Sequence, residues 1–251
     1  MPVSPLLLAL AAFAFVLAGF VKGVLGQGLP TVAVGLLSLM MSPGEAAALI
    51  VLPALITNVW QAWFGPSMRP LLRRLWPTLL ASFVGTFVAT ALGLGLLTPE
   101  AAALARQALG WALVVYGLLG VSRIQIQVPP RAEPWLGPLF GAANGAVATM
   151  TGVFMFPVIP YIQALGLDRD DLVQAQGISF TVSSFALMLV VLANGTLNAT
   201  TSAASLLALL VTFVGLFIGQ SIRRFAPHRL FRFLFFCAML ALGVHLALIH
   251  R

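Results

Sequence analysis

Charged residues are scarce in this chain of 251 residues: they make up 8% of it, against roughly a quarter of a typical soluble domain. There are six Asp and Glu residues, one lysine and one cysteine, Cys237. A single cysteine excludes an intramolecular disulfide and a metal site built from several cysteines. A soluble fold of this length could not cover its surface with so few charges, and 61% of the residues are hydrophobic. The composition therefore predicts an all-α polytopic membrane protein.

The sequence motifs of intramembrane and nucleotide-dependent enzymes are missing as well. No pair of aspartates lies inside an apolar segment, and the three histidines (His228, His245 and His250) form no recognisable constellation with a serine. The phosphate-binding pattern G-x-x-x-x-G-K-[ST] does not occur. We therefore expect no enzymatic activity and no cofactor. The net charge of +7 comes from arginines dispersed between apolar segments, which indicates a positive-inside topology and not nucleic-acid binding.

The apolar segments divide into six that can each cross a bilayer and two that are interrupted. The full-length segments, near the about 20 residues that a crossing requires, are Glu45–Phe64, Thr78–Leu97, Ala101–Val121, Leu172–Ala193, Ser202–Ile222 and Phe231–Ile249. The interrupted segments are residues 6–41 (Leu6–Lys22 and Leu29–Met41) and 135–165 (Trp135–Met150 and Val153–Leu165). The polar stretch Ser122–Glu133 contains a Pro-Pro pair and predicts a linker. We expect a first repeat half at residues 1–121, a linker at 122–133 and a second half at 134–251.

The arginines predict the orientation of these segments. They gather in three connections: Arg69, Arg73 and Arg74 in one, Arg123 and Arg131 in the linker, and Arg223, Arg224 and Arg229 in the third. Placing these connections in the cytoplasm fixes the alternation of the full-length helices. Each interrupted segment must then enter and leave the membrane on the same side, as a re-entrant hairpin or as two short helices. Both termini come out extracytoplasmic.

An offset of 126 residues aligns the two halves. It places Gly19 on Gly145, Gly26 on Gly152, Glu45 on Asp171, and the pair Thr57-Asn58 on the pair Ser183-Ser184. Because three full crossings per half is an odd number, the second half is predicted to be inverted relative to the first. Many secondary transporters follow this plan, with a site near the midplane where their broken helices meet. The alternative is chance similarity between apolar runs.

The stretch from Gly19 to Pro30, G-F-V-K-G-V-L-G-Q-G-L-P, surrounds the single lysine, Lys22. An ammonium at membrane depth is costly and is normally paired or faces water, but every acidic residue lies at a segment end or in the linker. The stretch therefore predicts an anion site made by Lys22, by Gln27 and by the amides near Gly26 and Gly28. The alternative is a lysine that snorkels to the interface.

Further polar residues are predicted to complete this site. The second interruption supplies Asn144 and Thr151, and the helices that follow the two interruptions carry polar faces with Thr57 and Asn58 in the first half and Gln176 and Ser183 in the second. Polar residues also join helices in membranes without binding a ligand, which is the alternative for each of them.

With these residues, the sequence resembles the sulfite exporter TauE/SafE family of permeases. The likeness covers nearly the whole chain and rests on the stretch around Lys22, on its counterpart around Gly141–Pro157, and on two halves joined by a short polar linker. It implies movement of small sulfur-containing anions across the bacterial inner membrane. Where G-x-G-G-G is common in the family, this chain reads T-M-T-G-V-F-M-F-P. This leaves open whether the second break is as open and whether the substrate is bulkier than sulfite; Phe154 and Phe156 would suit an organic sulfonate.

The resulting hypothesis is a multi-pass secondary transporter of a sulfite, sulfonate or sulfoacetate type of anion. Its expected partners are that anion and the lipid bilayer, with no nucleic acid; the oligomeric state, the direction of transport and the coupling ion stay open. Two alternatives remain. One is transport of a different small organic or inorganic anion, and the other is a membrane assembly protein that transports nothing.

Overall fold

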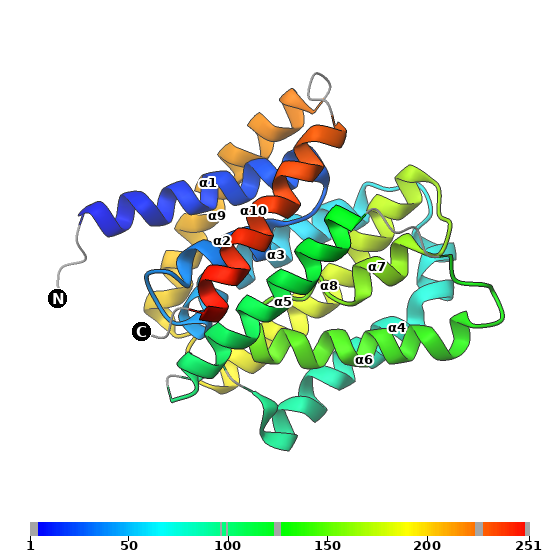
Figure 1. Ribbon diagram of the computed structural model, residues 1–251, viewed down its shortest axis with the longest axis horizontal. Helices are drawn as coiled ribbons and strands as arrows, with labels where there is room; N and C mark the ends of the chain where they lie inside the picture. Colours follow the sequence, from blue (N-terminus) through cyan, green and yellow to red (C-terminus); the bar gives the residue numbers. More distant parts are fainter. Residues whose placement is uncertain (1–4, 96, 99, 123–126, 224–227, 249–251) are drawn as a thin grey trace.

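The computed structural model describes residues 5–95, 97–98, 100–122, 127–223 and 228–248, and within these ranges it is built from helices without strands (Figure 1). Arg123, Arg224 and His250, named above, and residues 123–126 of the expected linker lie outside the described residues. The helices are α1 (Pro5–Leu25), α2 (Leu29–Leu37), α3 (Pro43–Trp63), α4 (Met68–Ala89) with the π-helical turn η1 (Thr90–Leu94), α5 (Ala102–Ser122), α6 (Glu133–Thr151), α7 (Val158–Gln163), α8 (Arg169–Ala193), α9 (Ala199–Ile222) and α10 (His228–Leu248).

Seven helices in the described part of the chain are long and apolar enough to cross a membrane: α1, α3, α4 with η1, α5, α8, α9 and α10. The prediction of an all-α polytopic membrane protein is confirmed. The sequence predicted six full-length segments, and α1 adds the seventh. This helix starts at Pro5 and continues past Lys22 to Leu25, so it has 21 residues where the sequence suggested a shorter piece.

Both predicted interruptions are present. After α1 the chain turns at Gly26 and Gly28, which have φ angles of 75° and 101°, and the short helix α2 follows. After α6 it turns at Gly152, whose φ is 74°, and continues through residues 153–157 to the short helix α7. Residues with a side chain rarely adopt this left-handed conformation, so glycine at these positions permits the chain to reverse.

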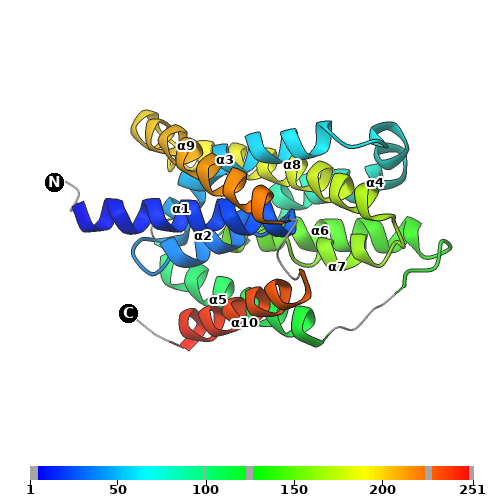
Figure 2. The same cartoon turned by 90° about the horizontal axis from the view of Figure 1, so that it is seen from above.

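The helices pack in pairs that an inverted repeat would produce. Helix α1 packs along α9 and α6 along α4, while α3 packs on α8 and α5 on α10. If α1 to α5 correspond in order to α6 to α10, every one of these pairings maps onto another or onto itself. Both termini lie at one end of the molecule and the starts of α4 and α6 at the other, in two perpendicular views (Figures 1 and 2). The arrangement is consistent with the predicted inverted repeat and with its parity.

Glycines bring the paired helices close together. A Cβ at Gly141 or Gly145 of α6 would overlap with backbone atoms of Thr78 and Ser82 of α4. Small residues at these contacts permit van der Waals packing between helix backbones, which takes the place of the hydrophobic effect in lipid. Glycines of α1 and α9 do the same, namely Gly19, Gly23, Gly215 and Gly219. The pairs α1–α9 and α4–α6 are therefore two closely packed units.

Arginines hold the carboxyl ends of both short helices. Arg106 of α5 donates to the carbonyl oxygens of Ser38 and Met41, at 3.1 and 3.3 Å, just after α2. Arg74 of α4 donates to the carbonyl oxygen of Leu165 at 3.1 Å, just after α7, and forms a bidentate ion pair with Glu133. Carbonyls at a helix end lack partners within the helix, and a guanidinium there satisfies them and complements the helix dipole.

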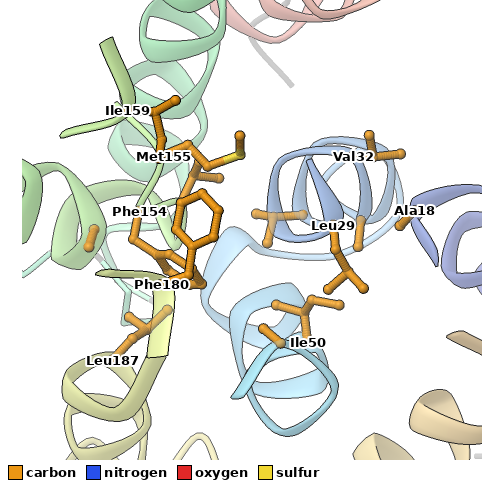
Figure 3. Packing of buried hydrophobic residues seen from close by; sticks show 14 of the residues in the cluster. Ala18, Leu29, Val32, Ile50, Phe154, Met155, Ile159, Phe180 and Leu187 are labelled. Atoms are coloured by element: carbon orange, nitrogen blue, oxygen red, sulfur yellow. The ribbon is translucent and has the colours of Figure 1, made fainter. Parts of the chain in front are cut away.

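An apolar core fills the space between the two interruptions. Phe154 and Met155 of the second interruption are fully buried against Phe180 of α8, Leu29 and Val32 of α2 and Ile50 of α3 (Figure 3). The rings of Phe154 and Phe180 have centroids 5.9 Å apart. The space between the interruptions is thus packed with apolar side chains, and the cavity described below lies beside the end of α1.

Candidate functional site

Lys22 lies near the carboxyl end of α1 and is 4% exposed. Its ammonium donates to Thr57 Oγ1 at 3.0 Å and to Asn58 Oδ1, and both acceptors belong to α3. Both are uncharged, and among the described residues no carboxylate pairs with Lys22. An ammonium has three donors, so one is left after these two bonds. Lys22 does not snorkel in this structure; its amino group is buried and has only neutral partners among the described residues.

The local structure of α3 explains why Thr57 accepts a hydrogen bond from Lys22. Pro53 lies in the middle of this helix and has no amide hydrogen, so the carbonyl of Leu49 loses its helical partner. The hydroxyl of Ser205 on α9 donates to that carbonyl instead, at 2.7 Å. The Thr57 hydroxyl donates to the carbonyl of Pro53 at 2.7 Å. Its hydrogen is thereby used within α3, and its lone pairs are turned toward Lys22.

Asn58 continues the hydrogen bonds into the second half. Its Nδ2 donates to Ser184 Oγ of α8 at 2.9 Å, and that hydroxyl donates to the carbonyl of Phe180. The side chain of Asn58 is 1% exposed and its oxygen and nitrogen both have partners, so its orientation is fixed. The network therefore holds the ammonium in place from a helix pair, α3–α8, that joins the two halves.

A cavity of about 290 Å³ lies beside Lys22. Its lining residues come from α1, the first interruption, α3, α8 and α9, namely Lys22, Gly23, Gly26, Thr57, Trp60, Gln61, Phe64, Val173, Leu216, Gln220 and Arg223. Trp60, Phe64 and Gln220 are exposed, so the cavity opens at the end of the molecule where α3 and α9 finish. The arginines that follow these helices lie at the same end, which the positive-inside rule predicts to be cytoplasmic.

The described lining contains two positive charges and no acidic side chain. Lys22 lies on the buried side, and Arg223 lies just after α9. Burial lowers the pKa of the Arg223 guanidinium, and the nearby positive charge of Arg169 acts in the same direction while Asp170 opposes it. Two cations and the amides of Gln61 and Gln220 suit a small anion chemically.

Of the remaining predicted site residues, one lines the cavity and the others are not among its lining residues. Gly26 lines it, while Gln27 and Gly28 follow in the interruption; Gln27 is 6% exposed and its Oε1 has no partner among the described residues. Gln176 is buried on α8. Thr151, at the end of α6, bonds within its own turn, to the carbonyl of Val147 and the amide of Val153.

Asn144 and Ser183 form a second polar cluster with Ser82 of α4. Asn144 Nδ2 donates to Ser82 Oγ at 3.0 Å and to Ser183 Oγ at 3.2 Å, and the two hydroxyls are 3.3 Å apart. We call these three residues the serine–asparagine triad. Asn144 is completely buried, and its Oδ1 has no partner among the described residues. Asn144 and Ser183 thus bond to each other and to Ser82, and among the described residues no hydrogen bond joins them to Lys22, Thr57 or Asn58.

Several cavity residues were not predicted. Gln220 is a lone amide in the apolar segment Ser202–Ile222, and a search for polar residues near segment ends would have found it. Arg223 was interpreted only as a topology signal. Trp60 and Phe64 have no sequence signal that separates them from other aromatic residues near an interface. Phe154, expected beside a substrate, packs in the core instead (Figure 3).

The described residues contain no group of three or more His, Cys, Asp and Glu side chains that could hold a metal ion.

Comparison with known proteins identifies the family of this chain. No curated protein and no solved structure matches the chain. The model of the family described as sulfite exporter TauE/SafE matches residues 11–246, which is nearly the whole chain and includes both interruptions, the cavity and the triad. The chain therefore belongs to the sulfite exporter TauE/SafE family and is a multi-pass membrane permease.

Proposed function

We propose that this permease carries a small sulfur-containing anion, of the sulfite, sulfonate or sulfoacetate type, across the bacterial inner membrane. The anion binds in the cavity beside Lys22. One observation carries the proposal: a buried ammonium with only neutral partners lines an open cavity and keeps one donor for a ligand. A charge buried without a counter-ion is costly, and an anion in the cavity would supply the missing one.

The cavity also restricts the substrate. A volume of about 290 Å³ accepts an oxyanion with a short organic tail. Because no acidic side chain is among the described residues that line the cavity, an ammonium group on the substrate would find no charged partner there. We therefore expect sulfite, methanesulfonate and sulfoacetate to bind in preference to taurine, which carries an ammonium next to its sulfonate.

The two halves, residues 1–121 and 134–251, act as the repeat units of the carrier. The closely packed units α1–α9 and α4–α6, each with one helix from either half, move relative to the central pair α3–α8. Lys22, Thr57, Asn58 and Gly26 belong to the anion site. No carboxylate lies near Lys22 among the described residues, so the proposal includes exchange of one anion for another as well as uniport.

Thermal unfolding of the purified protein against a panel of anions tests the proposal. A ligand at 100 times its Kd stabilises the folded state by about 2.7 kcal/mol, which corresponds to a rise of several degrees in Tm for a chain of this length. At this concentration we expect sulfite or a sulfonate to raise the Tm of the wild type clearly more than that of Lys22→Met. An equal rise in both proteins would move the site away from Lys22.

The same panel tests the two alternatives. A rise with acetate or a metal oxyanion, and none with sulfur anions, would keep the carrier and replace its substrate. A membrane assembly protein predicts no rise with any anion. The cavity with its two cations favours a carrier, because a scaffold needs no such site.

A further inference from the structure

The surroundings of the two interruptions correspond through the same offset of 126 residues as the sequence. Gly26 lies beside Val173, and Gly152 lies beside Ala47. Gly152 follows Gly26 by 126 positions and Val173 follows Ala47 by the same number, so the offset turns one contact into the other. A Cβ at Gly26 would lie 3.8 Å from Val173, and one at Gly152 would lie 2.9 Å from Ala47. Each half thus places its interruption against the start of the spanning helix that follows the other interruption.

This correspondence defines a mirror position for the cavity. Under the offset of 126, Lys22, Gly23 and Thr57 map to Ala148, Thr149 and Ser183, and an offset of 130 between α4 and α9, which aligns Gly85 with Gly215, maps Leu216 to Thr86. The mirror residues Ala148, Thr149 and Thr86 have no exposed surface, and Ser183 is 1% exposed. One position is therefore open and its counterpart is closed.

The serine–asparagine triad closes the mirror position. Ser82 and Asn144 belong to the closely packed unit α4–α6, and Ser183 belongs to α8. On the open side, the unit α1–α9 corresponds to α4–α6, and the cavity lies between that unit and the helices α3 and α8. The mirror cavity would therefore open by separation of α4–α6 from α8, which breaks the bonds from Ser183 to Ser82 and Asn144.

Two buried polar atoms near the triad weaken the closed arrangement. Asn144 Oδ1 and Ser179 Oγ, the latter one turn before Ser183 on α8, have no partner among the described residues. Leaving a buried polar atom unpaired costs about 1–3 kcal/mol. This cost weakens the closed arrangement, and it disappears when the atoms are hydrated.

We infer that the chain has a second anion-accessible cavity at this mirror position, lined by Thr86, Thr149 and Ser183, and that the serine–asparagine triad is the contact that keeps it closed here. The inference rests on the proposed carrier function. The anion reaches Lys22 through the open cavity in this state and leaves through the mirror cavity once the triad has separated, as alternating access between inverted repeats requires.

A disulfide across the triad tests this. Ser82→Cys and Ser183→Cys, in a Cys237→Ser background, join α4 to α8. Oxidation is expected to lower uptake of radiolabelled sulfite into proteoliposomes at least tenfold, and a reductant to restore it. The matched control is Gly117→Cys with Leu240→Cys, because a Cβ at Gly117 would lie 3.0 Å from that of Leu240. This disulfide joins α5 to α10, outside both units and both cavities, so its oxidised and reduced forms should transport equally.

Equal transport by the oxidised and reduced triad variants would overturn the inference, and so would loss of transport in the oxidised control. The proposed function has a separate readout: anions that raise the Tm of the wild type should also raise that of the oxidised triad variant, because the Lys22 cavity stays open in it. Absence of any rise in the wild type would count against the carrier and not against the mirror cavity.

A second experiment measures how fast a cysteine at the mirror position reacts with a reagent in water. It tests the inference if sulfite is not the substrate or if the paired cysteines impair folding. A single Thr86→Cys in the Cys237→Ser background should react with a membrane-impermeant maleimide at least ten times faster than Ala105→Cys, although both residues have no exposed surface here. Ala105 lies on α5, which contributes no lining residue to the open cavity or to the mirror position. Equal rates for the two cysteines would overturn the inference.

Discussion

The side chain of Asn58 donates a hydrogen bond to Ser184 across 2.9 Å, and these residues are 126 positions apart, the offset that aligns the two halves of the chain. Equivalent positions of the two halves thus meet at the α3–α8 contact. The other end of the same amide accepts from Lys22. A single asparagine therefore connects the charge of the candidate anion site to the contact between the halves.

The net charge of the site can be changed through this asparagine. Asn58→Asp keeps the shape of the side chain and puts a carboxylate against the ammonium. The resulting buried ion pair neutralises the site, so we expect the anion-induced rise in Tm to disappear and transport to fall at least tenfold. The folded protein itself should keep its stability, because the ammonium gains a counter-ion.

Ser184→Ala is the matched control for Asn58→Asp. It removes the second hydrogen bond of Asn58 without adding charge, and a typical hydrogen bond contributes about 0.5–1.5 kcal/mol. Anion binding should survive in this variant with a slightly lower Tm. If Asn58→Asp binds anions as the wild type does, Lys22 is not the group that holds them.

Lys22→Met should lose anion binding while the protein still folds and inserts. A hydrogen bond to a charged group contributes about 1.5–3 kcal/mol, so the Kd for the anion should rise by about 10- to 150-fold. Methionine removes the cost of burying an ammonium, which offsets the two lost bonds to α3. The measurement is an anion titration followed by Tm, with size-exclusion chromatography to check folding. Arg223→Gln, at the mouth, should raise the Kd less than Lys22→Met does.

Much of this architecture could be predicted from the sequence, because glycine and proline interrupt long apolar runs at the places where the chain reverses. Gly26 and Gly152 were aligned by the offset, and both have left-handed backbone conformations. The pairing of Lys22 with Thr57 and Asn58 was not predictable in detail. It depends on how closely α1 approaches α3 in space, which periodicity along either helix does not specify.

The separation of Asn144 and Ser183 from the Lys22 group had no sequence signal either. The sequence assigns Asn144 to the second interruption and Ser183 to the polar face of the helix that follows it, so it groups both with Lys22 in one cavity. Ser82 decides their placement, and this serine lies in an apolar segment where small polar residues are common at helix contacts.

Arg106 is expected to stabilise the first short helix. Its guanidinium donates to the carbonyls of Ser38 and Met41, which have no further helical turn to bond with. Arg106→Met should lower the free energy of unfolding by about 1–3 kcal/mol, because two carbonyls lose a charged donor. The Tm should fall by several degrees in the absence of any anion. Arg106→Lys keeps the charge but not the fork of donors and should lie between the two. A Tm equal to that of the wild type would show that the arginine does not hold α2.

Alanine substitutions at Gly145 and Gly93 distinguish the cost of lost helix packing from the cost of a left-handed backbone conformation. A Cβ at Gly145 would lie 2.5 Å from the amide nitrogen of Thr86 and would also overlap with the carbonyl oxygen of Ser82, so Gly145→Ala must push α6 away from α4. Gly93 has a φ of 78°, but a Cβ there would meet nothing within 4 Å. Gly93→Ala should therefore cost only the left-handed conformation, about 1–2 kcal/mol.

Gly145→Ala should lower the Tm further and also impair transport, because it separates a unit that the proposed cycle moves as one body. Equal losses of stability in the two variants would mean that α4 and α6 tolerate separation, and the rigid unit on which the mirror cavity depends would have to be abandoned.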